Sequence, residues 1–140
     1  MLHGPNLNLL GKREPEIYGR ASLEEVNSGL ARRAGELGIQ VECRQSNHEG
    51  QLIDWIQAAP GGFQGLVLNP GGLTTSSVAL RDAVLAAGLP TVEVHISNIH
   101  AREEFRRGSL ISGAAWGSIT GLGPSGYQLA LEALAGRLQA

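Results

Sequence analysis

The chain has 140 residues, a formal net charge of -2 and 42% hydrophobic residues, which suits one globular domain of residues 1–140 with a sizeable core. Its 20 glycines follow no three-residue period, which excludes collagen, and the low net charge with plentiful apolar residues excludes intrinsic disorder. No apolar run approaches the ~20 residues of a membrane span, no basic stripe indicates nucleic-acid binding, and the single Cys43 favours a reducing, cytoplasmic setting.

Strands and helices are expected to alternate along the chain. The chain enters a loop directly after Met1-Leu2-His3, so we expect the first strand to be truncated. Apolar, β-branched runs whose starts are 26 residues apart predict four further strands, at Ile39–Cys43, Gly65–Leu68, Thr91–Ile96 and Gly117–Thr120. Helical patterns lie between them: one capped by Ser22 and ended by Gly38, then 50–59, a third from Ser76 or Ser77 to Ala87, a short charged helix at 101–107, and 125–139.

This alternation predicts an α/β fold with a flavodoxin-like, doubly wound parallel sheet and helices on both faces. Ligands of such folds bind outside the carboxyl ends of the strands. The candidate site therefore comprises the segments that follow the strands, which are His3–Tyr18, Gln45–Glu49, Asn69–Ser77, His95–His100 and Gly121–Gly126.

Neither a dinucleotide-binding site nor a metal site is expected. The G-x-G-x-x-G pattern at Gly121–Gly126 has only 14 residues after it, too few for the second strand and acidic residue of a dinucleotide site. We therefore interpret it as close packing of a strand against a helix. The four histidines lack metal-ligand spacing and no cysteine cluster accompanies them, so no metal site is expected.

The loop at 6–19 has the length of a lid or binding element. It carries Arg13 and Tyr18 near Asn6. An arginine beside a tyrosine favours the phenolate, so this pair is a candidate base. A tyrosine packed on the rim beside a solvated arginine is an equally simple interpretation.

A second candidate is His95, at the carboxyl end of a predicted strand. Glu93 shares its strand face two residues earlier, where a carboxylate would orient the imidazole and hold it protonated. The backbone N–H groups of Ile96 and Ser97 follow and are placed to bind a carboxylate. The alternative interpretation is a partly buried histidine with satisfied hydrogen bonds. By default the next arginines form a solvated face, with one of them available to a ligand anion: Arg102, Arg106 and Arg107.

Together these segments resemble the type II 3-dehydroquinate dehydratases over nearly the whole chain. The resemblance rests on His3–Asn8 with Arg13–Pro15 and Tyr18-Gly19, Gln45–Gly50, Asn69–Gly71, Glu93–Asn98 with His100–Arg106, and Gly121–Gly123 with Gly126-Tyr127. It implies anti elimination of water from 3-dehydroquinate through an enolate, which gives 3-dehydroshikimate. It implies no cofactor or metal, and a role in the shikimate pathway of aromatic amino acid biosynthesis or in quinate catabolism.

The resemblance also implies residue roles. Tyr18, activated by Arg13, would be the base, and Asn6 would hold the water that stabilises the enolate oxygen. His95, oriented by Glu93, would be the acid. The substrate would be bound by Asn69, Thr75, the Ile96 and Ser97 N–H groups, and Arg106. Asp82 matches an aspartate that approaches a neighbouring subunit's site, and a dodecamer built from trimers is implied.

The sequence departs from the family pattern in two places. Leu73 and Thr75 stand where the family usually has a tyrosine and a histidine, so Thr75 would lose a contact to a ring hydroxyl, at a cost of about 1–3 kcal/mol. The truncated first strand should cost stability more than chemistry. The departures leave open a catalytically weak or silent paralogue that binds a cyclic polyol carboxylate. A flavodoxin-like nucleotide or phosphorelay module is disfavoured, because the strand ends lack an acidic cluster.

Overall fold

The computed structural model describes residues 1–140 and contains a five-stranded, all-parallel sheet with the strand order β2-β1-β3-β4-β5. This is the flavodoxin-like order expected from the alternation of elements. Its strands are β1 (Leu2–His3), β2 (Arg44–Gln45), β3 (Leu66–Asn69), β4 (Thr91–His95) and β5 (Gly117–Thr120). As predicted, β1 is short.

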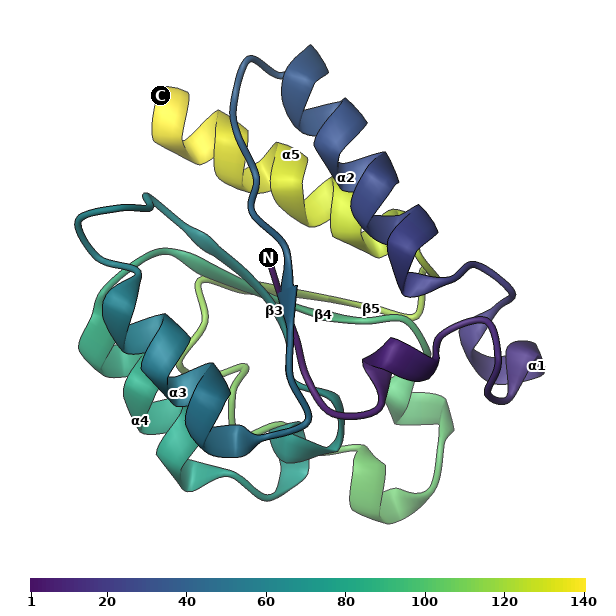
Figure 1. Ribbon diagram of the computed structural model, residues 1–140. Coiled ribbons are helices and arrows are strands. Elements are labelled where there is room, and N and C mark those ends of the chain that lie inside the picture. The colour runs from purple at the N-terminus through teal and green to yellow at the C-terminus, as the bar shows by residue number, and fades with distance from the viewer.

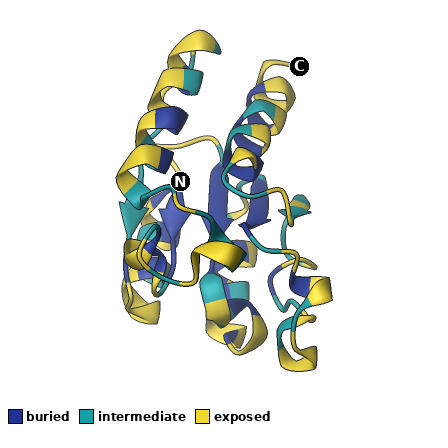
Figure 2. Ribbon diagram, turned by 90° about the vertical axis from the view of Figure 1, so that its right-hand side faces the viewer, coloured by how far each residue is buried: buried dark blue, intermediate teal, exposed yellow.

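Helices cover both faces of the sheet (Figure 1). One face carries α2 (Leu23–Glu36) and α5 (Ser125–Gln139), and the other carries α3 (Glu49–Ala58) and α4 (Val78–Ala87). The short α1 (Pro15–Tyr18) projects from the edge of the molecule. Each face has its own apolar core, and Figure 2 shows the buried strands between helices whose outer surfaces are exposed. The parallel sheet is therefore buried on both sides, as its apolar strands require.

The helices begin and end where local side-chain chemistry places them. The Ser22 hydroxyl accepts a hydrogen bond from the Glu25 N–H and begins α2, and the Ser77 hydroxyl accepts one from Leu80 and begins α4. These bonds satisfy N–H groups that have no partner inside the helix. Gly88 follows α4 with a φ of 67°, a left-handed conformation that a glycine adopts without strain.

Two predicted elements are wrong. Ile39–Cys43 is not a strand, and β2 begins only at Arg44. The reason is that β1 has too few residues to pair with the earlier segment: the Arg44 N–H donates to the Met1 carbonyl, and there the ladder ends. The charged helix at 101–107 is instead two separate 3-10 turns, Ile99–Ala101 and Glu104–Arg106, because the residues between them are extended.

None of the helices combines the length and the apolar character that crossing a membrane requires.

Candidate active site

A cavity of about 330 Å³ lies at the carboxyl ends of β3 and β4, under the loop that follows β1. Most of the residues predicted from the sequence line it: Asn6, Arg13, Tyr18, Asn69, Thr75, His95, Ile96, Ser97 and Arg106. The predicted Glu93 is fully buried and contacts one of these residues, His95. The remaining predicted residue, Asp82, is exposed on α4 and is not part of the lining. Because these residues come from four separate segments, the fold alone brings them together.

We call the part of the cavity formed by Asn69, Glu93 and His95 the strand side. Glu93 and His95 are two residues apart on β4, so both side chains leave the same face. His95 Nε2 lies 2.7 Å from Glu93 Oε1. His95 Nδ1 makes no hydrogen bond and remains available to a ligand. The carboxylate thus fixes the orientation of the ring, as predicted.

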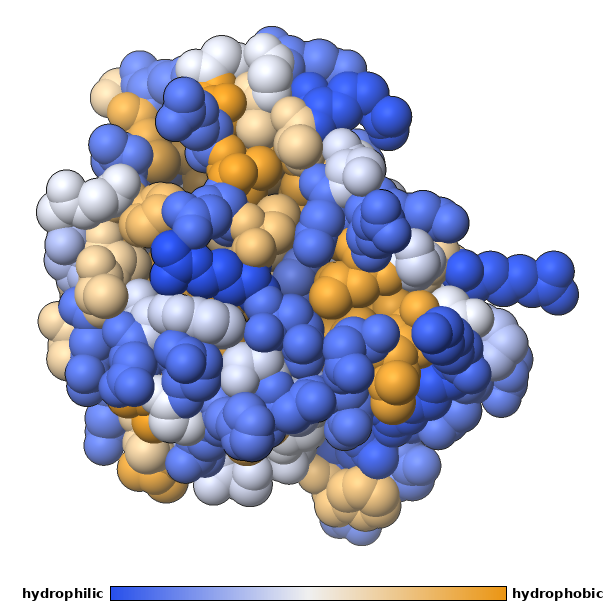
Figure 3. Space-filling view, in the orientation of Figure 1, coloured by the Kyte–Doolittle hydropathy of each residue, from blue (hydrophilic) through white to orange (hydrophobic).

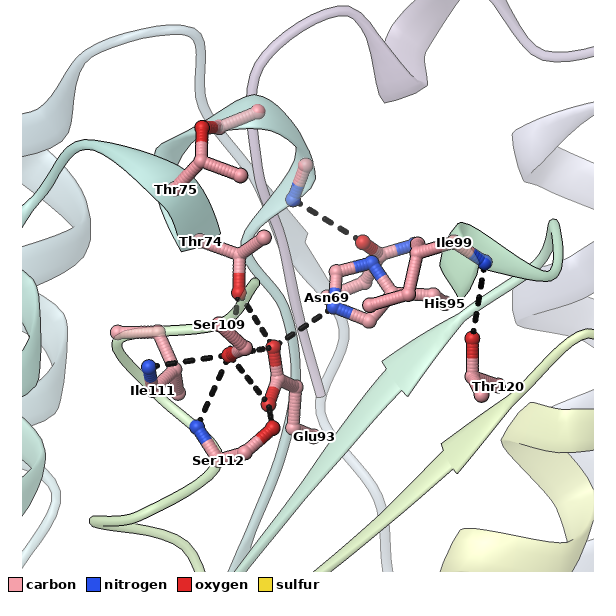
Figure 4. A network of polar contacts seen from close by, with 12 residues as sticks. Asn69, Thr74, Thr75, Glu93, His95, Ile99, Ser109, Ile111, Ser112 and Thr120 are labelled. Atoms are coloured by element: carbon pink, nitrogen blue, oxygen red, sulfur yellow. Dashed lines mark hydrogen bonds and ion pairs between the residues drawn. The ribbon is translucent and has the colours of Figure 1, made fainter. Parts of the chain in front are cut away.

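Three hydroxyl groups surround the Glu93 carboxylate (Figure 4). Thr74 and Ser112 each donate to one of its oxygens, and Ser109 lies 2.8 and 3.0 Å from the two oxygens. Burial opposes the charged form, but the hydrogen bonds from His95 and the hydroxyls outweigh it, so the pKa of Glu93 falls to about 2. Glu93 is therefore a permanent anion beneath the histidine.

Asn69 is held by two hydrogen bonds at the end of β3. Its Nδ2 donates to the Tyr127 hydroxyl at 2.7 Å, and its Oδ1 accepts from the Gly71 N–H at 3.1 Å. Tyr127 is fully buried, and burial raises the pKa of its hydroxyl. Its ring packs edge-on against His3, at 5.4 Å between centroids. Tyr127 therefore supports the site from below, and Tyr18 is the tyrosine that lines the cavity.

We call the part formed by Arg13, Tyr18 and Arg102 the loop side. Arg13 lies against the Tyr18 ring, 5.1 Å from its centroid, as predicted. The hydrogen bond to the Tyr18 hydroxyl, however, comes from Arg102, whose Nη1 lies 2.7 Å away. The Arg102 side chain is only 13% exposed, so its assignment to a solvated face was wrong. Two guanidinium groups therefore flank one phenol.

Oxygen-binding groups line the rest of the cavity. Ile96 and Ser97 continue the chain just past β4. Arg106 lies on the second 3-10 turn, and its buried Nε makes no hydrogen bond, although Glu103 Oε2 is 3.2 Å away. The Thr75 hydroxyl donates to the Gly72 carbonyl at 3.0 Å, so it is turned to its own backbone. These groups give the cavity a positive, hydrogen-bonding wall that suits an oxygen-rich anion.

The loop after β1 is held in place by backbone contacts. Asn6 has a φ of 69°, and its N–H donates to Asn47 Oδ1 at 2.9 Å. The Gly4 N–H donates to the Asn69 carbonyl at 2.8 Å. A Cβ atom at Gly4 would lie 2.7 Å from the Pro70 backbone, so only glycine allows the two loops to cross there.

Several residues of the site were not predicted from the sequence. Ser109 and Ser112 lie in an irregular loop before β5 and have no neighbouring motif that would have singled them out. Thr74 stands beside the predicted Thr75, but its buried side chain points to Glu93. For Arg102 the only available signal was its place among three arginines shortly after β4.

The remaining motifs take no part in this cavity. Gly121 follows β5 with a φ of 87°, and a Cβ there would lie 2.9 Å from Asn98. A Cβ at Gly126 would contact Ile119 and Val94 at 3.4 Å. The glycine pattern thus serves close packing, as interpreted. No group of three or more His, Cys, Asp or Glu side chains is arranged to hold a metal ion.

The chain is similar to one family of known proteins over nearly its whole length. A family model described as dehydroquinase class II matches residues 1–135. The 3-dehydroquinate dehydratase of Halothermothrix orenii is 58% identical over 134 residues, covering 96% of this chain and 90% of the relative. That of Pelotomaculum thermopropionicum is 56% identical over 135 residues, covering 96% and 94%. The crystal structure of type II dehydroquinase from Propionibacterium acnes matches with a TM-score of 0.93 and 44% identity, covering 96% and 93%.

Proposed function

This chain belongs to the class II dehydroquinase family and has 3-dehydroquinate dehydratase activity, and from this premise we propose that it works by anti elimination through an enolate. One observation carries the mechanism: a tyrosine bonded to an arginine and a histidine bonded to a carboxylate line the same cavity. Such a pair supplies a base and an acid to one small substrate.

Tyr18 is the proposed base. It removes the proton α to the substrate's ketone, and the electron pair of the broken C–H bond moves toward the carbonyl to form an enolate. Arg102 donates to the Tyr18 oxygen, and Arg13 lies over the ring. Both cations stabilise negative charge on the phenol oxygen. We assign the activation of the base to Arg102 together with Arg13.

His95 is the proposed acid. The enolate collapses, the C–O bond β to the ketone breaks, and His95 gives its proton to the departing hydroxyl, which leaves as water. Glu93 supports this step because it remains ionised and bonded to Nε2. Asn6 lines the cavity, and we assign it to the water that stabilises the enolate oxygen.

The substrate carboxylate and ring hydroxyls are assigned to the wall of the cavity. The Ile96 and Ser97 N–H groups and the Arg106 guanidinium would bind the carboxylate, since all of them are donors and one is charged. Asn69 would bind the hydroxyls, and Thr75 would line their position without reaching them, because its hydroxyl donates to Gly72. The physiological context that we propose is the shikimate pathway or quinate catabolism.

Asp82 is assigned to a neighbouring subunit. It is exposed on α4, outside the cavity of its own chain, where another copy could reach it. By resemblance we propose an assembly of trimers that forms a dodecamer. Sedimentation velocity that finds a monomer with full activity would contradict it.

The test is steady-state turnover of 3-dehydroquinate, followed by the absorbance of the conjugated enone product. Wild type should turn over, and Tyr18→Phe should lower kcat by about 10²–10⁴-fold, the range of a general base. Full activity in Tyr18→Phe would remove Tyr18 as the base. Calorimetric binding without any product would instead support the silent paralogue.

A further inference from the structure

Ser109, in the irregular loop before β5, is the centre of the hydroxyl groups around Glu93 (Figure 4). Its Oγ lies 2.8 Å from Oε1 and 3.0 Å from Oε2 of the carboxylate, and 2.8 Å from the Thr74 hydroxyl. It also accepts hydrogen bonds from the Ile111 and Ser112 N–H groups, at 3.1 and 3.0 Å. Ser109 is the side chain that contacts both oxygens of the carboxylate.

The partners of Ser109 fix the direction of its own hydrogen bond. A serine hydroxyl has one proton to donate and two lone pairs that accept. The two backbone N–H groups occupy both lone pairs, so the proton of Ser109 points to Glu93. For the same reason Thr74 cannot donate to Ser109, and its proton also goes to the carboxylate. The backbone of the loop thus makes Ser109 a donor of fixed direction.

The carboxylate of Glu93 has no room for a proton of its own. It accepts from the three hydroxyls, and His95 Nε2 lies 2.7 Å from its Oε1. These partners fill the roughly four lone-pair sites of an ionised carboxylate. The proton between the two side chains therefore stays on His95 Nε2, which leaves Nδ1 as the ring atom available to a ligand.

The loop that carries Ser109 is anchored by its neighbours, although it has no regular structure. The Leu110 N–H donates to the Thr74 carbonyl at 2.8 Å, and the Leu110 carbonyl accepts from Arg81 Nη1 of α4 at 2.6 Å. Ile111 is fully buried in the apolar core beneath α3 and α4. The outer surface of α3 is mostly hydrophilic (Figure 3), so its apolar side faces this core. The fold, and not a ligand, therefore holds the donor to Glu93 in place.

We propose that Ser109 is a positioning residue of the dehydration, which orients Glu93 as an anion and thereby keeps the proton on His95 Nε2. The inference rests on the proposed function, in which His95 is the acid. Ser109 does not line the cavity, so it acts on the reaction only through Glu93 and the histidine. A buried carboxylate is stable only with hydrogen-bond donors. Without Ser109 the carboxylate can rotate, and the imidazole loses the orientation that protonation of the departing hydroxyl requires.

The test is steady-state kinetics of Ser109→Ala with 3-dehydroquinate. We expect kcat to fall by about 10–100-fold, the value of a hydrogen bond to a charged group, while KM stays within about twofold. Ser109→Thr keeps the hydroxyl and should restore most of kcat. Thr91→Val is the matched control, because it removes a buried hydroxyl from the same face of β4 that bonds to the Leu89 carbonyl. This control should leave kcat unchanged.

A double-mutant cycle separates positioning from a general loss of structure. Because Ser109 acts through Glu93, Ser109→Ala should lower kcat by less than about twofold in the Glu93→Gln background. A second full loss there would overturn the proposal, and so would an unchanged kcat in Ser109→Ala alone. If Ser109→Ala does not fold, Ser112→Ala removes one donor to Oε2 and leaves the loop amides bonded. It should lower kcat about three- to tenfold at constant KM, and no fall would equally overturn the proposal.

His95→Gln distinguishes failure of this inference from failure of the proposed function. If His95→Gln lowers kcat strongly and Ser109→Ala does not, the acid assignment stands and the role of Ser109 is overturned. If His95→Gln retains full activity, the proposed acid is wrong and the role of Ser109 falls with it.

Discussion

The strand side and the loop side of the cavity are built in different ways. On the strand side, Glu93 and Asn69 are buried, and each polar atom of their side chains has a fixed partner. On the loop side, Tyr18 is only partly buried and its partner Arg102 comes from a segment without regular structure. The sheet therefore preorganises the proposed acid, whereas the proposed base depends on the contact between two loops.

Among the variants that compare the two sides, Glu93→Gln on the strand side should have the largest effect. Glu93→Gln replaces an anion with an amide whose NH2 group faces hydroxyl donors. We expect kcat to fall by about 10²–10³-fold and the free energy of unfolding to fall by about 3 kcal/mol, as for a broken buried pair. Enone absorbance and urea denaturation measure the two quantities. Glu104→Gln, at an exposed glutamate, is the control and should change neither.

The same variant should also change how the free energy of unfolding depends on pH in acid. The pKa of Glu93 is lowered to about 2 from an ordinary 4.5, so its stabilising contribution is complete above pH 4.5 and is lost as the pH falls toward 2. Wild type should lose stability across this window, and Glu93→Gln should lose less. If the stability of the two proteins fell in parallel with pH, the stabilisation of ionised Glu93 by the surrounding hydroxyls would be contradicted.

A slightly smaller effect concerns His3, which supports the strand side through Tyr127. His3 is fully buried, and desolvation lowers its pKa from 6.5 to about 4. Its Nδ1 has no partner, so protonation would bury an unpaired donor. The unfolding free energy should therefore drop by about 3 kcal/mol as the pH falls from 6.5 through 4.

Denaturation at a series of pH values measures this drop. His3→Asn, which can still donate to Asn27, should remove it, while His100→Asn, at an exposed histidine, should retain it. An unchanged slope in His3→Asn would place the acid sensitivity elsewhere.

The next prediction concerns the loop side and compares the loss of kcat when each of its two arginines is replaced. Arg102→Met removes the hydrogen bond to the Tyr18 hydroxyl, and we expect kcat to fall about 100-fold. Arg13→Met removes the cation over the ring and an exposed ion pair with Glu14 but no hydrogen bond to the Tyr18 hydroxyl, and we expect kcat to fall about tenfold. Arg137→Met, on α5, is the control for lost charge. Were Arg13 the more damaging position, the hydrogen bond seen here would not describe the working site.

The smallest effect is expected at Thr75. Its hydroxyl is turned to the Gly72 carbonyl, so a longer donor should reach a substrate hydroxyl that Thr75 does not. Thr75→His should lower KM about three- to tenfold, near 1 kcal/mol of binding, with Thr75→Val as the matched control. A large change in kcat rather than KM would give Thr75 a role in chemistry.

The sheet order and the place of the site could be predicted because both follow from periodicity. Strands at a constant spacing imply parallel pairing, and the polar residues after each strand must then meet at one edge. His95 and Glu93 were predictable for the same reason, since alternate strand residues share a face. The prediction of a strand at 39–43 was wrong because pairing of this segment depends on the length of β1, not on its own β-branched residues.

Arg102 and the serines could not be predicted, for a different reason. A long arginine side chain can lie in solvent or reach across the molecule, and Tyr18 is 84 residues away in sequence. Ser109 and Ser112 contact a carboxylate that only the folded loop brings near them. Such contacts depend on loop conformation, which local patterns do not encode.

The crossing of the two loops at Gly4 has a consequence for tolerance to mutation. Gly4 is not among the residues that line the cavity, yet a single methyl group there would collide with the Pro70 backbone. In a saturation scan this position should therefore reject all nineteen replacements, whereas cavity-lining Thr75 accepts several. Intolerance at Gly4 would then reflect steric exclusion between two backbones, and a mutational map alone would misread it as contact with the substrate.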